Sequence, residues 1–326
     1  MVTLKVTAKP VEPLCQAAKN IVPVNVVNEM QEAYGAYALA NLARTLPDCR
    51  DSLIPVQRRI LFAAYSGGYS SSKKFVKCAR LMGDTSGKYH PHGESYGALI
   101  TMSNTWNNLI PIMDFHGSNS TSTSNAASSR YTETKLCAYA EKVLLQEIET
   151  LETKLNYDAT LQEPIYLNAR LPNLLVFASR GISVGYATHC LSHNINEVIA
   201  ATIKYIKSDS KAKIKLVPDF KQGCDIIYTK DILQQYAETG QATFKLRAKL
   251  VGVETVKEKR TKLTLYTFEN IPYDTNVEKI GAQLKTAVET GKYGDLQLRS
   301  IEDGSDRTGD RLIVVSKRSD IAELLY

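Results

Sequence analysis

The pair Arg130-Tyr131 is the place where residue types and spacing most clearly allow chemistry. A phenol is a poor nucleophile at neutral pH unless a neighbour stabilises its charged form or its transition state. Arg130 is adjacent, and Arg44 could converge on the same point through the fold. Guanidinium groups bind phosphate oxygens in a bidentate way, which suits an in-line phosphoryl transfer. The alternative is an ordinary surface tyrosine, one of 18 in the chain.

His90 and His92 form a second pair with possible chemistry. They alternate around Pro91, so they cannot lie on one face of a regular helix. Two histidines this close could hold a metal ion, but no third cysteine or histidine lies at ligand spacing. The sequence therefore disfavours zinc and predicts no metal site in this chain.

Basic residues are concentrated in one stretch of the chain. Nine of them lie between Arg44 and Gly93, where only three acidic residues oppose them. This local excess equals the formal net charge of +6 of the whole chain, so the remainder is balanced. Such a block favours a polyanionic partner, with nucleic acid first, and the alternative is a solvated surface of salt bridges. The nine residues are Arg44, Arg50, Arg58, Arg59, Lys73, Lys74, Lys77, Arg80 and Lys88.

Composition restricts the class of protein. The 326 residues are enough for two or three domains, and 44% hydrophobic with 23% charged residues excludes wholesale disorder. No apolar run approaches the ~20 residues of a membrane span, and residues 1–9 do not form a signal peptide. The six cysteines contain no CxxC pair, which favours reduced thiols over disulfides or zinc.

Helices are expected to position the candidate residues. The pattern predicts a helix over 26–44 and a second one that starts at Pro55, with Arg58 pointing away from its buried stripe. A third helix is expected after a cap at 70–72, with Lys73, Lys77 and Arg80 on one face. A fourth is expected over 94–106.

The second half of the chain mixes both kinds of element. Residues 118–129 have the composition of a flexible linker. Helices are expected over 136–155, 196–208 and 276–292, a hairpin over 242–256 and 262–268, and a strand over 311–315. The fold class expected for the whole chain is α+β.

Four motifs occur in a fixed order. They are Leu46-Pro-Asp-Cys-Arg-Asp-Ser-Leu-Ile-Pro-Val-Gln-Arg-Arg59, Gly87-Lys-Tyr-His-Pro-His-Gly-Glu-Ser95, Ser129-Arg-Tyr-Thr-Glu133, and Pro172-Asn-Leu-Leu-Val with Gly181-Ile-Ser-Val-Gly-Tyr-Ala-Thr188 and His193-Asn194. With them the chain resembles the breakage-reunion subunit of type IIA DNA topoisomerases, that is, the A subunit of DNA gyrase and of topoisomerase IV. The resemblance runs from about Val24 to the C-terminus. The stretch Asn104-Thr-Trp-Asn-Asn108 is more similar to the phage-type medium subunit.

The resemblance implies a domain organisation. It implies an N-terminal arm (1–25), a helix-rich winged-helix DNA-cleavage domain (26–165) and an α/β tower-like domain (166–326). In the family a coiled coil and a dimer gate follow, so the end at Tyr326 implies a truncated or reduced form.

The resemblance also implies roles for individual residues. Tyr131 would attack a DNA phosphate and form a transient 5′-phosphotyrosyl link in a double-strand break, through which a second duplex passes before resealing. Arg130 and Arg44 would assist in catalysis, and Ile182 would wedge between base steps and bend the DNA. The further DNA contacts implied are Arg58, Arg59, Lys73, Lys77, Arg80, Lys88, His90, His92 and Ser95.

The partners follow from the same resemblance. They are double-stranded DNA, a second copy of the chain, and a B-type subunit that hydrolyses ATP and holds most of the Mg²⁺, in an A2B2 assembly. No membrane is involved. The implied location is the bacterial cytoplasm or a phage-infected cell.

Some residues depart from the family pattern. Ile54 replaces a usual lysine, Leu99 replaces an acidic residue associated with quinolone binding, and Phe115-His-Gly-Ser-Asn-Ser-Thr121 replaces a glycine-rich loop. The replaced loop and the early end at Tyr326 keep a second interpretation open, a degenerate module that binds or bends DNA, or inhibits a host topoisomerase, without cleaving. An unrelated basic RNA-binding protein would not explain the ordered motifs.

Overall fold

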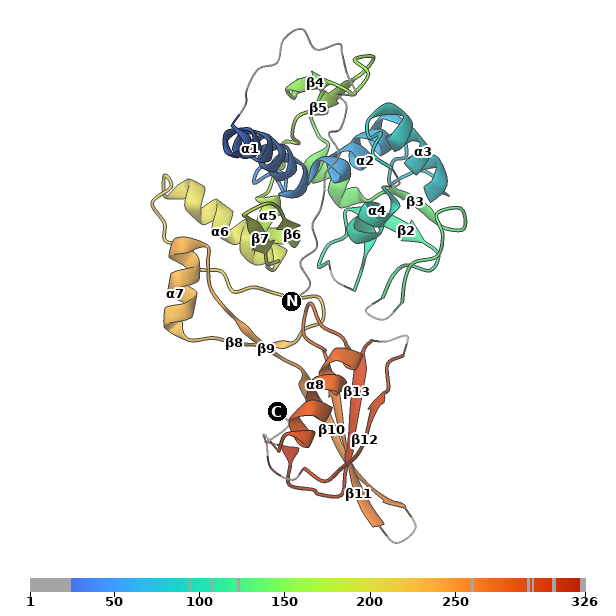
Figure 1. Cartoon of the computed structure of the whole chain (residues 1–326), viewed down its shortest axis with the longest axis vertical. Coiled ribbons are helices and arrows are strands. Elements are labelled where there is room, and N and C mark those ends of the chain that lie inside the picture. The colour runs from blue at the N-terminus through green and yellow to red at the C-terminus, as the bar shows by residue number, and fades with distance from the viewer. Residues whose placement is uncertain are drawn as a thin grey trace, which may run out of the picture.

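The computed structural model describes residues 25–322, apart from eleven positions. These are Glu94, Asn107, Ser122, Thr123, Lys259, Arg260, Lys292, Tyr293, Asp295, Arg307 and Thr308. Figure 1 shows a helix-rich body and, below it along the longest axis, an antiparallel sheet with one helix. The chain is therefore α+β, as the sequence predicts.

The first part of the body consists of four helices and a small antiparallel sheet. The helices are α1 (Val26–Thr45), α2 (Pro55–Ser66), α3 (Cys78–Lys88) and α4 (Tyr96–Ser103). The sheet has the order β1 (Val76–Lys77), β3 (Glu133–Leu136), β2 (Met113–His116).

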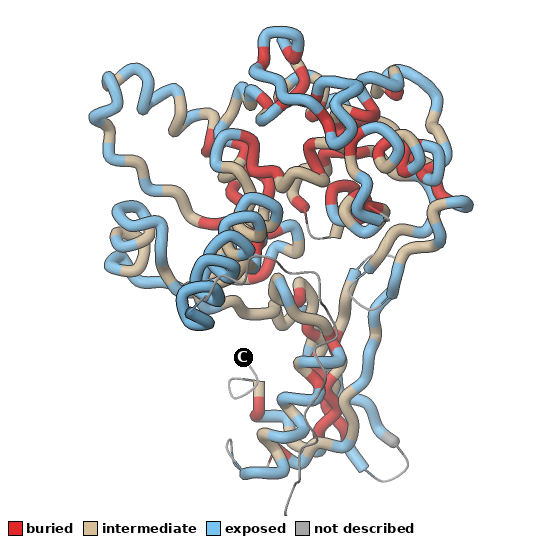
Figure 2. The backbone as a smooth tube through the Cα atoms, turned by 45° about the horizontal axis from the view of Figure 1, so that its top comes forward, coloured by how far each residue is buried: buried red, intermediate tan, exposed pale blue. Residues whose placement is uncertain are grey.

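Helix α2 shows why the local sequence folds as it does. Pro55 occupies the first turn, where its missing N–H costs nothing, and the Gln57 side chain accepts a hydrogen bond of 3.1 Å from the backbone of Ile54. Ile60 and Leu61 are fully buried in a core that extends from Leu53 to Phe177. Figure 2 shows buried residues gathered inside the body and along the sheet below it.

The middle of the chain has short elements. A π-helix (Ala140–Leu144) and a 3-10 helix (Ile148–Thr150) precede the hairpin of β4 (Thr153–Leu155) and β5 (Gln162–Pro164). Next come α5 (Asn173–Val176), the hairpin β6 (Ser179–Ile182) and β7 (Ala187–Cys190), α6 (Ile195–Lys207), β8 (Asp225–Ile227), α7 (Lys230–Thr239) and β9 (Lys245–Arg247).

The C-terminal part is a four-stranded antiparallel sheet. Its order is β10 (Lys249–Glu258), β11 (Thr261–Glu269), β13 (Arg311–Ser316), β12 (Leu298–Asp303). Helix α8 (Val277–Glu289) packs on β12 and β13. The core between them includes Tyr266 and Val314, both fully buried. The expected hairpin, the helices at 196–208 and 276–292, and the strand at 311–315 are all confirmed.

Two predicted elements are wrong. The helix expected from Lys73 onward begins at Cys78, because Val76 and Lys77 pair instead with Thr134 and Glu133 as strand β1. The three cations therefore do not share one helical face. The helix expected over 136–155 breaks up, and Glu147 adopts a left-handed conformation with φ of 58°.

The helix expected over 94–106 spans only Tyr96–Ser103, so Trp106 lies beyond its end. The predicted linker over 118–129 is a loop closed by a 3.0 Å hydrogen bond from the Ala127 N–H to the Ser118 carbonyl. The winged-helix assignment and the domain boundaries at 25 and 165 stay predictions, and the expected arm lies, except for Asn25, outside the described residues. Of the described helices, none is long and apolar enough to cross a membrane.

The buried carboxylate of Asp51 links most elements of the body. It accepts hydrogen bonds from Arg58 (2.6 and 3.0 Å) and from the backbone N–H groups of Leu53 and Leu167 (3.0 and 2.9 Å). The Asp51 carbonyl accepts a 2.7 Å bond from the side chain of Asn173 in α5. The turn between α1 and α2, helix α2 itself and the segment around α5 are therefore joined at one residue.

We expect Asp51→Asn to lower the free energy of unfolding of the body by about 3–5 kcal/mol, because it leaves the Arg58 charge buried without its counter-ion. Asp48→Asn is the matched control, since the Asp48–Arg50 pair lies in the same turn but is partly exposed, at 24% and 49%. Its effect should stay below about 1 kcal/mol. Urea unfolding followed by Trp106 fluorescence measures both, and equal effects would contradict the role given to Asp51.

Candidate active site and nucleic-acid interface

The loop that carries Tyr131 is anchored to the start of helix α3. The Cys78 N–H donates to the Thr132 carbonyl (3.0 Å) and the Ala79 N–H to the Ser129 carbonyl (3.1 Å). These N–H groups at the start of a helix have no partner within the helix, so the loop satisfies them. The backbone of Tyr131 is thereby fixed on both sides.

Helix α4 holds the same loop from another direction. The hydroxyl of Tyr96 donates to the Ala127 carbonyl (2.6 Å) and shares a 2.8 Å hydrogen bond with the Thr132 hydroxyl. Thr132 is fully buried, and a Cβ on Gly117 would come within 3.1 Å of its methyl group. The base of the loop is therefore tightly packed, so mobility of the backbone is restricted there.

Tyr131 itself points away from this base. The residue is 66% exposed, and the guanidinium carbon of Arg130 lies 4.9 Å from its ring centroid. A cation at this distance interacts favourably with the aromatic face. The structure thus presents an exposed phenol with a guanidinium beside it, as the sequence predicts for this pair.

Glu133 is the carboxylate next to this site in the chain. It pairs with Lys77 (2.9 Å) and lies 3.6 Å from His116. The Lys77 ammonium lowers the pKa of the Glu133 carboxyl. Lys77 is therefore exposed but already paired, and a phosphate would have to compete with Glu133 for it.

The opposite end of α3 carries a second cluster. His90 follows this end, and its Nδ1 lies 3.0 Å from a guanidinium nitrogen of Arg59. Arg59 also binds both carboxylate oxygens of Glu163, at 2.8 Å each. Burial and the Arg59 charge lower the pKa of His90. Glu163, which the sequence did not single out, lies 104 residues from Arg59 in the chain and had no local signal.

The structure separates Tyr131 from this second cluster. Helix α3 has 11 residues, and its axis is therefore about 16 Å long at 1.5 Å per residue. Tyr131 lies at its beginning, and His90 and His92, with ring centroids 5.3 Å apart, follow its end. Arg44 lies in the last turn of α1 and is exposed, and its charge lowers the pKa of His90. The expected convergence of Arg44 on Tyr131 stays a prediction.

The hairpin of β6 and β7 presents Ile182 to solvent. Ile182 is 66% exposed and Tyr186, near it across the turn, is 67% exposed. Gly181 packs against the end of α1, where a Cβ would lie 2.6 Å from the Thr45 carbonyl oxygen. The Ser52 hydroxyl lies within 3.2 Å of the Phe177 carbonyl. An exposed apolar residue on an anchored hairpin has the geometry needed to enter between base steps.

Two of the predicted DNA contacts are buried in the structure. Arg58 is only 7% exposed. Its guanidinium donates to the Asp51 carboxylate and to the Leu53 carbonyl, so Arg58 forms a structural ion pair. Ser95 is 4% exposed, and its hydroxyl points to the sulfur of Met82. Neither side chain is therefore presented to solvent, in contrast to the expectation for Arg58 and Ser95.

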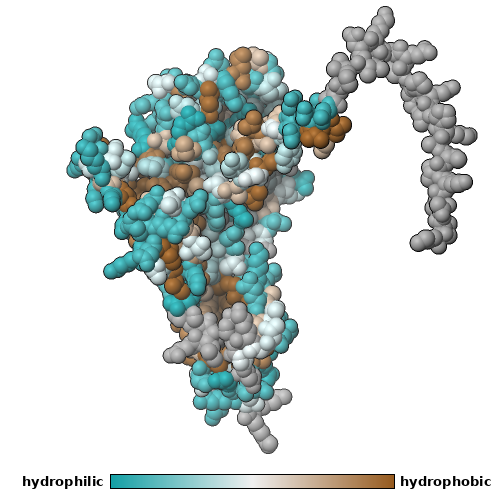
Figure 3. Space-filling view, turned by 60° about the vertical axis from the view of Figure 1, so that its left-hand side comes forward, coloured by the Kyte–Doolittle hydropathy of each residue, from teal (hydrophilic) through white to brown (hydrophobic). Residues whose placement is uncertain are grey.

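The other predicted contacts lie on the surface. Lys88 pairs with Asp84 (3.0 Å), and the guanidinium of Arg80 lies 5.5 Å from the ring centroid of Tyr69. Lys73, Lys77, Arg80, Lys88 and His92 are all exposed. Figure 3 shows that hydrophilic and apolar side chains alternate over the visible surface of the body.

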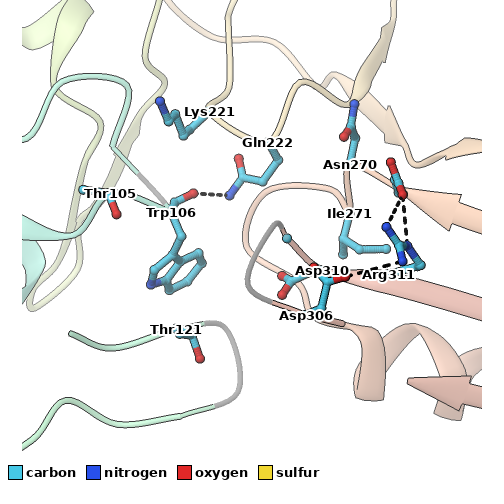
Figure 4. Close-up of a pocket in the computed structure, with 12 residues that line it drawn as sticks. Thr105, Trp106, Thr121, Lys221, Gln222, Asn270, Ile271, Asp306, Asp310 and Arg311 are labelled. Atoms are coloured by element: carbon cyan, nitrogen blue, oxygen red, sulfur yellow. Dashed lines mark hydrogen bonds and ion pairs between the residues drawn. The ribbon is translucent and has the colours of Figure 1, made fainter. Parts of the chain in front are cut away.

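A cavity of about 500 Å³ lies between the loop around Trp106 and the C-terminal sheet (Figure 4). The Gln222 amide donates to the Trp106 carbonyl (2.9 Å), and Arg311 binds Glu269 on the far side. None of the residues in the four motifs lines this cavity. The candidate chemistry therefore lies at the ends of α3 and not here.

The described residues do not fit a Mg²⁺ site. Mg²⁺ prefers carboxylate and water oxygens, but the described part of the chain has no group of three potential metal-ligating side chains. Glu133, the carboxylate beside Tyr131, is engaged by Lys77. A Mg²⁺ ion beside Tyr131 would therefore need ligands from outside the described residues.

Comparison with known proteins gives one family. The model of the family of A subunits of DNA gyrase/topoisomerase IV matches residues 44–324. Several bacterial DNA gyrase A subunits are similar over most of this chain. That of Streptomyces coelicolor is 36% identical over 94% of this chain and 37% of its own length. Those of Helicobacter pylori J99 and Synechocystis are each 35% identical, over 96% and 94% of this chain. The chain thus spans little more than a third of these relatives.

We expect Gly181→Ala to destabilise the β6–β7 hairpin, because the added methyl group would collide with the backbone of Thr45. The cost should be about 1–3 kcal/mol, as for other overpacked sites. Hydrogen exchange of the hairpin amides measures it and should become faster. Gly97→Ala is the control, since a Cβ there meets nothing within 4 Å. Unchanged protection of the hairpin in Gly181→Ala would show that it is not anchored at this contact.

Proposed function

The chain belongs to the A-subunit family of DNA gyrase and topoisomerase IV, and from this premise we propose that it breaks and rejoins DNA with Tyr131 as the nucleophile. One observation carries the proposal: an exposed phenol beside a guanidinium, on a loop that α3 and α4 hold rigidly. A nucleophile for a large polymeric substrate must be accessible, yet its position must be fixed.

The proposed reaction conserves the number of phosphoester bonds. The Tyr131 oxygen attacks a backbone phosphorus and loses its proton, while the bond to the 3′-oxygen breaks and that oxygen takes up a proton. The product is a 5′-phosphotyrosyl link and a free 3′-hydroxyl. Reversal of the same step reseals the strand. Arg130 would stabilise the charge that develops on the phosphoryl oxygens.

Neither of two other tyrosines near this loop is a suitable replacement. The hydroxyl of Tyr96 is engaged by the Ala127 carbonyl and the Thr132 hydroxyl. Tyr139 lies eight positions further along the chain, and its hydroxyl donates to the side chain of Asn173 (2.9 Å). Burial raises the pKa of Tyr139 to about 12, which makes its ionised form scarce at neutral pH. Tyr131 therefore has no local substitute.

We further propose that the chain acts as a twofold dimer on double-stranded DNA, because both strands must be cut. A dimer also offers a way to unite the two ends of α3, since the His90 cluster of one copy could approach Tyr131 of the other. A B-type subunit would supply ATP hydrolysis and Mg²⁺ in an A2B2 assembly in the cytoplasm. The wedge at Ile182 would bend the bound duplex.

We expect Tyr131→Phe to abolish the covalent protein–DNA adduct while duplex binding persists, because only the attacking oxygen is removed. The rate should fall by several orders of magnitude. The assay is denaturant trapping of the adduct with a cognate B-type subunit, Mg²⁺ and supercoiled DNA. Tyr205→Phe, at a 45% exposed tyrosine on α6, is the control and should cleave normally.

Adduct in Tyr131→Phe would refute the role of this residue. Inactivity of the unaltered chain with several B-type subunits, together with intact DNA binding, would instead favour the non-cleaving DNA-binding module.

We expect the triple change of Lys73, Lys77 and Arg80 to Ala to weaken duplex binding with little sequence preference, because phosphate contacts carry no sequence information. The slope of log affinity against log salt should flatten by about 0.9 for each phosphate that is no longer neutralised. The matched control removes Lys204, Lys207 and Lys211, at and beyond the end of α6. An equal change of slope in both variants would show that neither surface is a specific DNA contact.

A further inference from the structure

A buried carboxylate, Glu163 on β5, lies behind the second cluster. It is 2% exposed and binds Arg59 through both oxygens at 2.8 Å. Lys154 on β4 lies 3.5 Å from the same carboxylate. A two-pronged ion pair of this kind fixes the plane of the guanidinium as well as its position.

The fixed guanidinium has one further contact, with His90. An Arg59 nitrogen lies 3.0 Å from Nδ1 of His90. A guanidinium has donors only, so Nδ1 must accept this bond and the imidazole must be neutral. The proton of the ring then resides on Nε2, which leaves His90 an N–H donor on the side away from Arg59.

The hairpin that carries Glu163 is docked on the segment that carries His90. The side chain of Asn156 donates to the Lys88 carbonyl (2.6 Å), and the Tyr157 hydroxyl donates to the Gly87 carbonyl (2.9 Å). Carboxylate, guanidinium and imidazole are therefore held by one rigid unit, although Arg59 comes from α2.

We propose that Glu163 is a positioning residue that holds Arg59 against His90 and so fixes His90 as a neutral Nε2–H donor toward the DNA backbone. Only the contact of His90 with the DNA backbone rests on the proposed function. The tautomer is a property of the chain alone and can be tested without DNA. Arg59 serves as the link, because it contacts both of the other groups.

Other charges around His90 act on its pKa. Burial lowers it most, followed by the positive charges of Arg59, His92 and Arg44, whereas Glu163 raises it. His90 is accordingly neutral at pH 7, since its pKa lies below the ordinary value of about 6.5. Because Arg59 lowers the pKa of His90 and Glu163 raises it, the pKa of His90 in a Glu163 variant distinguishes two roles for Glu163.

If Glu163 acted only through its charge, its removal would lower the pKa of His90 further. If it holds Arg59 in place, its removal releases the guanidinium from Nδ1 and the pKa of His90 rises toward about 6.5. Glu163→Gln is a suitable change, because its shape is conserved but the amide NH₂ faces a guanidinium donor, so the two-pronged interaction is broken.

The test is NMR of the chain with ¹⁵N-labelled histidine, in which two-bond couplings distinguish the Nε2–H from the Nδ1–H form. We expect a single Nε2–H form for His90 in the unaltered chain. In Glu163→Gln we expect a mixture of forms and a higher pKa. Arg59→Gln should give the same result, and the double variant should be no worse than either, because both changes break one chain of contacts.

Lys154→Gln is the matched control, since it removes the charge 3.5 Å from Oε1 of Glu163 and keeps both Arg59–Glu163 bonds and the Arg59–His90 contact. It should leave the tautomer unchanged. A mixture of forms in the unaltered chain, or a lower pKa of His90 in Glu163→Gln, would overturn the proposal. So would a further change in the double variant.

A second measurement, the rate of DNA cleavage, tests whether Glu163 affects the proposed reaction. With Mg²⁺ and a B-type subunit, Glu163→Gln should slow cleavage on the order of 10- to 100-fold, as the loss of an orienting group does elsewhere. The pH dependence of the rate should shift upward with the pKa of His90. If the unaltered chain forms no adduct but His90 shows the expected tautomer, the proposed function falls and the positioning role stands.

Discussion

The ion pair between the buried Asp51 carboxylate and Arg58 is the interaction on which the arrangement of the body depends. The carboxylate is fully buried, and donors from α2, from its own turn and from the segment before α5 converge on it. A buried carboxylate without these partners would cost several kcal/mol, so the elements cannot separate independently. The end of α1 and the same turn contact Gly181 and Phe177, which place the hairpin of Ile182. The surroundings of the Asp51–Arg58 ion pair thus determine where the exposed Ile182 lies relative to α2 and its arginines.

Helix α3 divides the functional groups into two sets. Its first N–H groups bind the loop of Tyr131, and its last turn leads into His90 and the docked β4–β5 hairpin. A helix is the stiffest element that a short chain can form, so the separation of the two sets is fixed by its length. If the proposed reaction uses both sets, a second copy of the chain could bring them together, because α3 keeps them apart within one chain.

The sequence allowed the fold class, the late helices and the exposed Arg130-Tyr131 pair to be predicted, because these depend on local pattern or on a contiguous motif. Prediction from the sequence failed where contacts with other parts of the chain determine the local structure. Lys77 is a strand residue because it pairs with Glu133, more than fifty positions away. Arg58 was expected at the surface, since a charge opposite an apolar stripe is usually solvated, but the buried Asp51 lies seven residues before it. Glu163 was missed because no periodicity links a strand residue to Arg59 and His90.

The loop that departs from the family pattern shows how a different sequence can support the same site. Only Gly117 of this loop lies in the left-handed region, with φ of 118°, and it packs on Thr132 beside Tyr131. The side chain of Asn119 donates to the Ser103 carbonyl at 3.2 Å, and that of Asn104 to the Ser120 hydroxyl at 3.1 Å. The side-chain amides of Asn104 and Asn119 thus restrict the conformation of this loop. Each hydrogen bond removes backbone freedom that a glycine would leave. The loop is therefore held by side-chain hydrogen bonds at the end of α4, and Gly117 packs on Thr132 beside Tyr131.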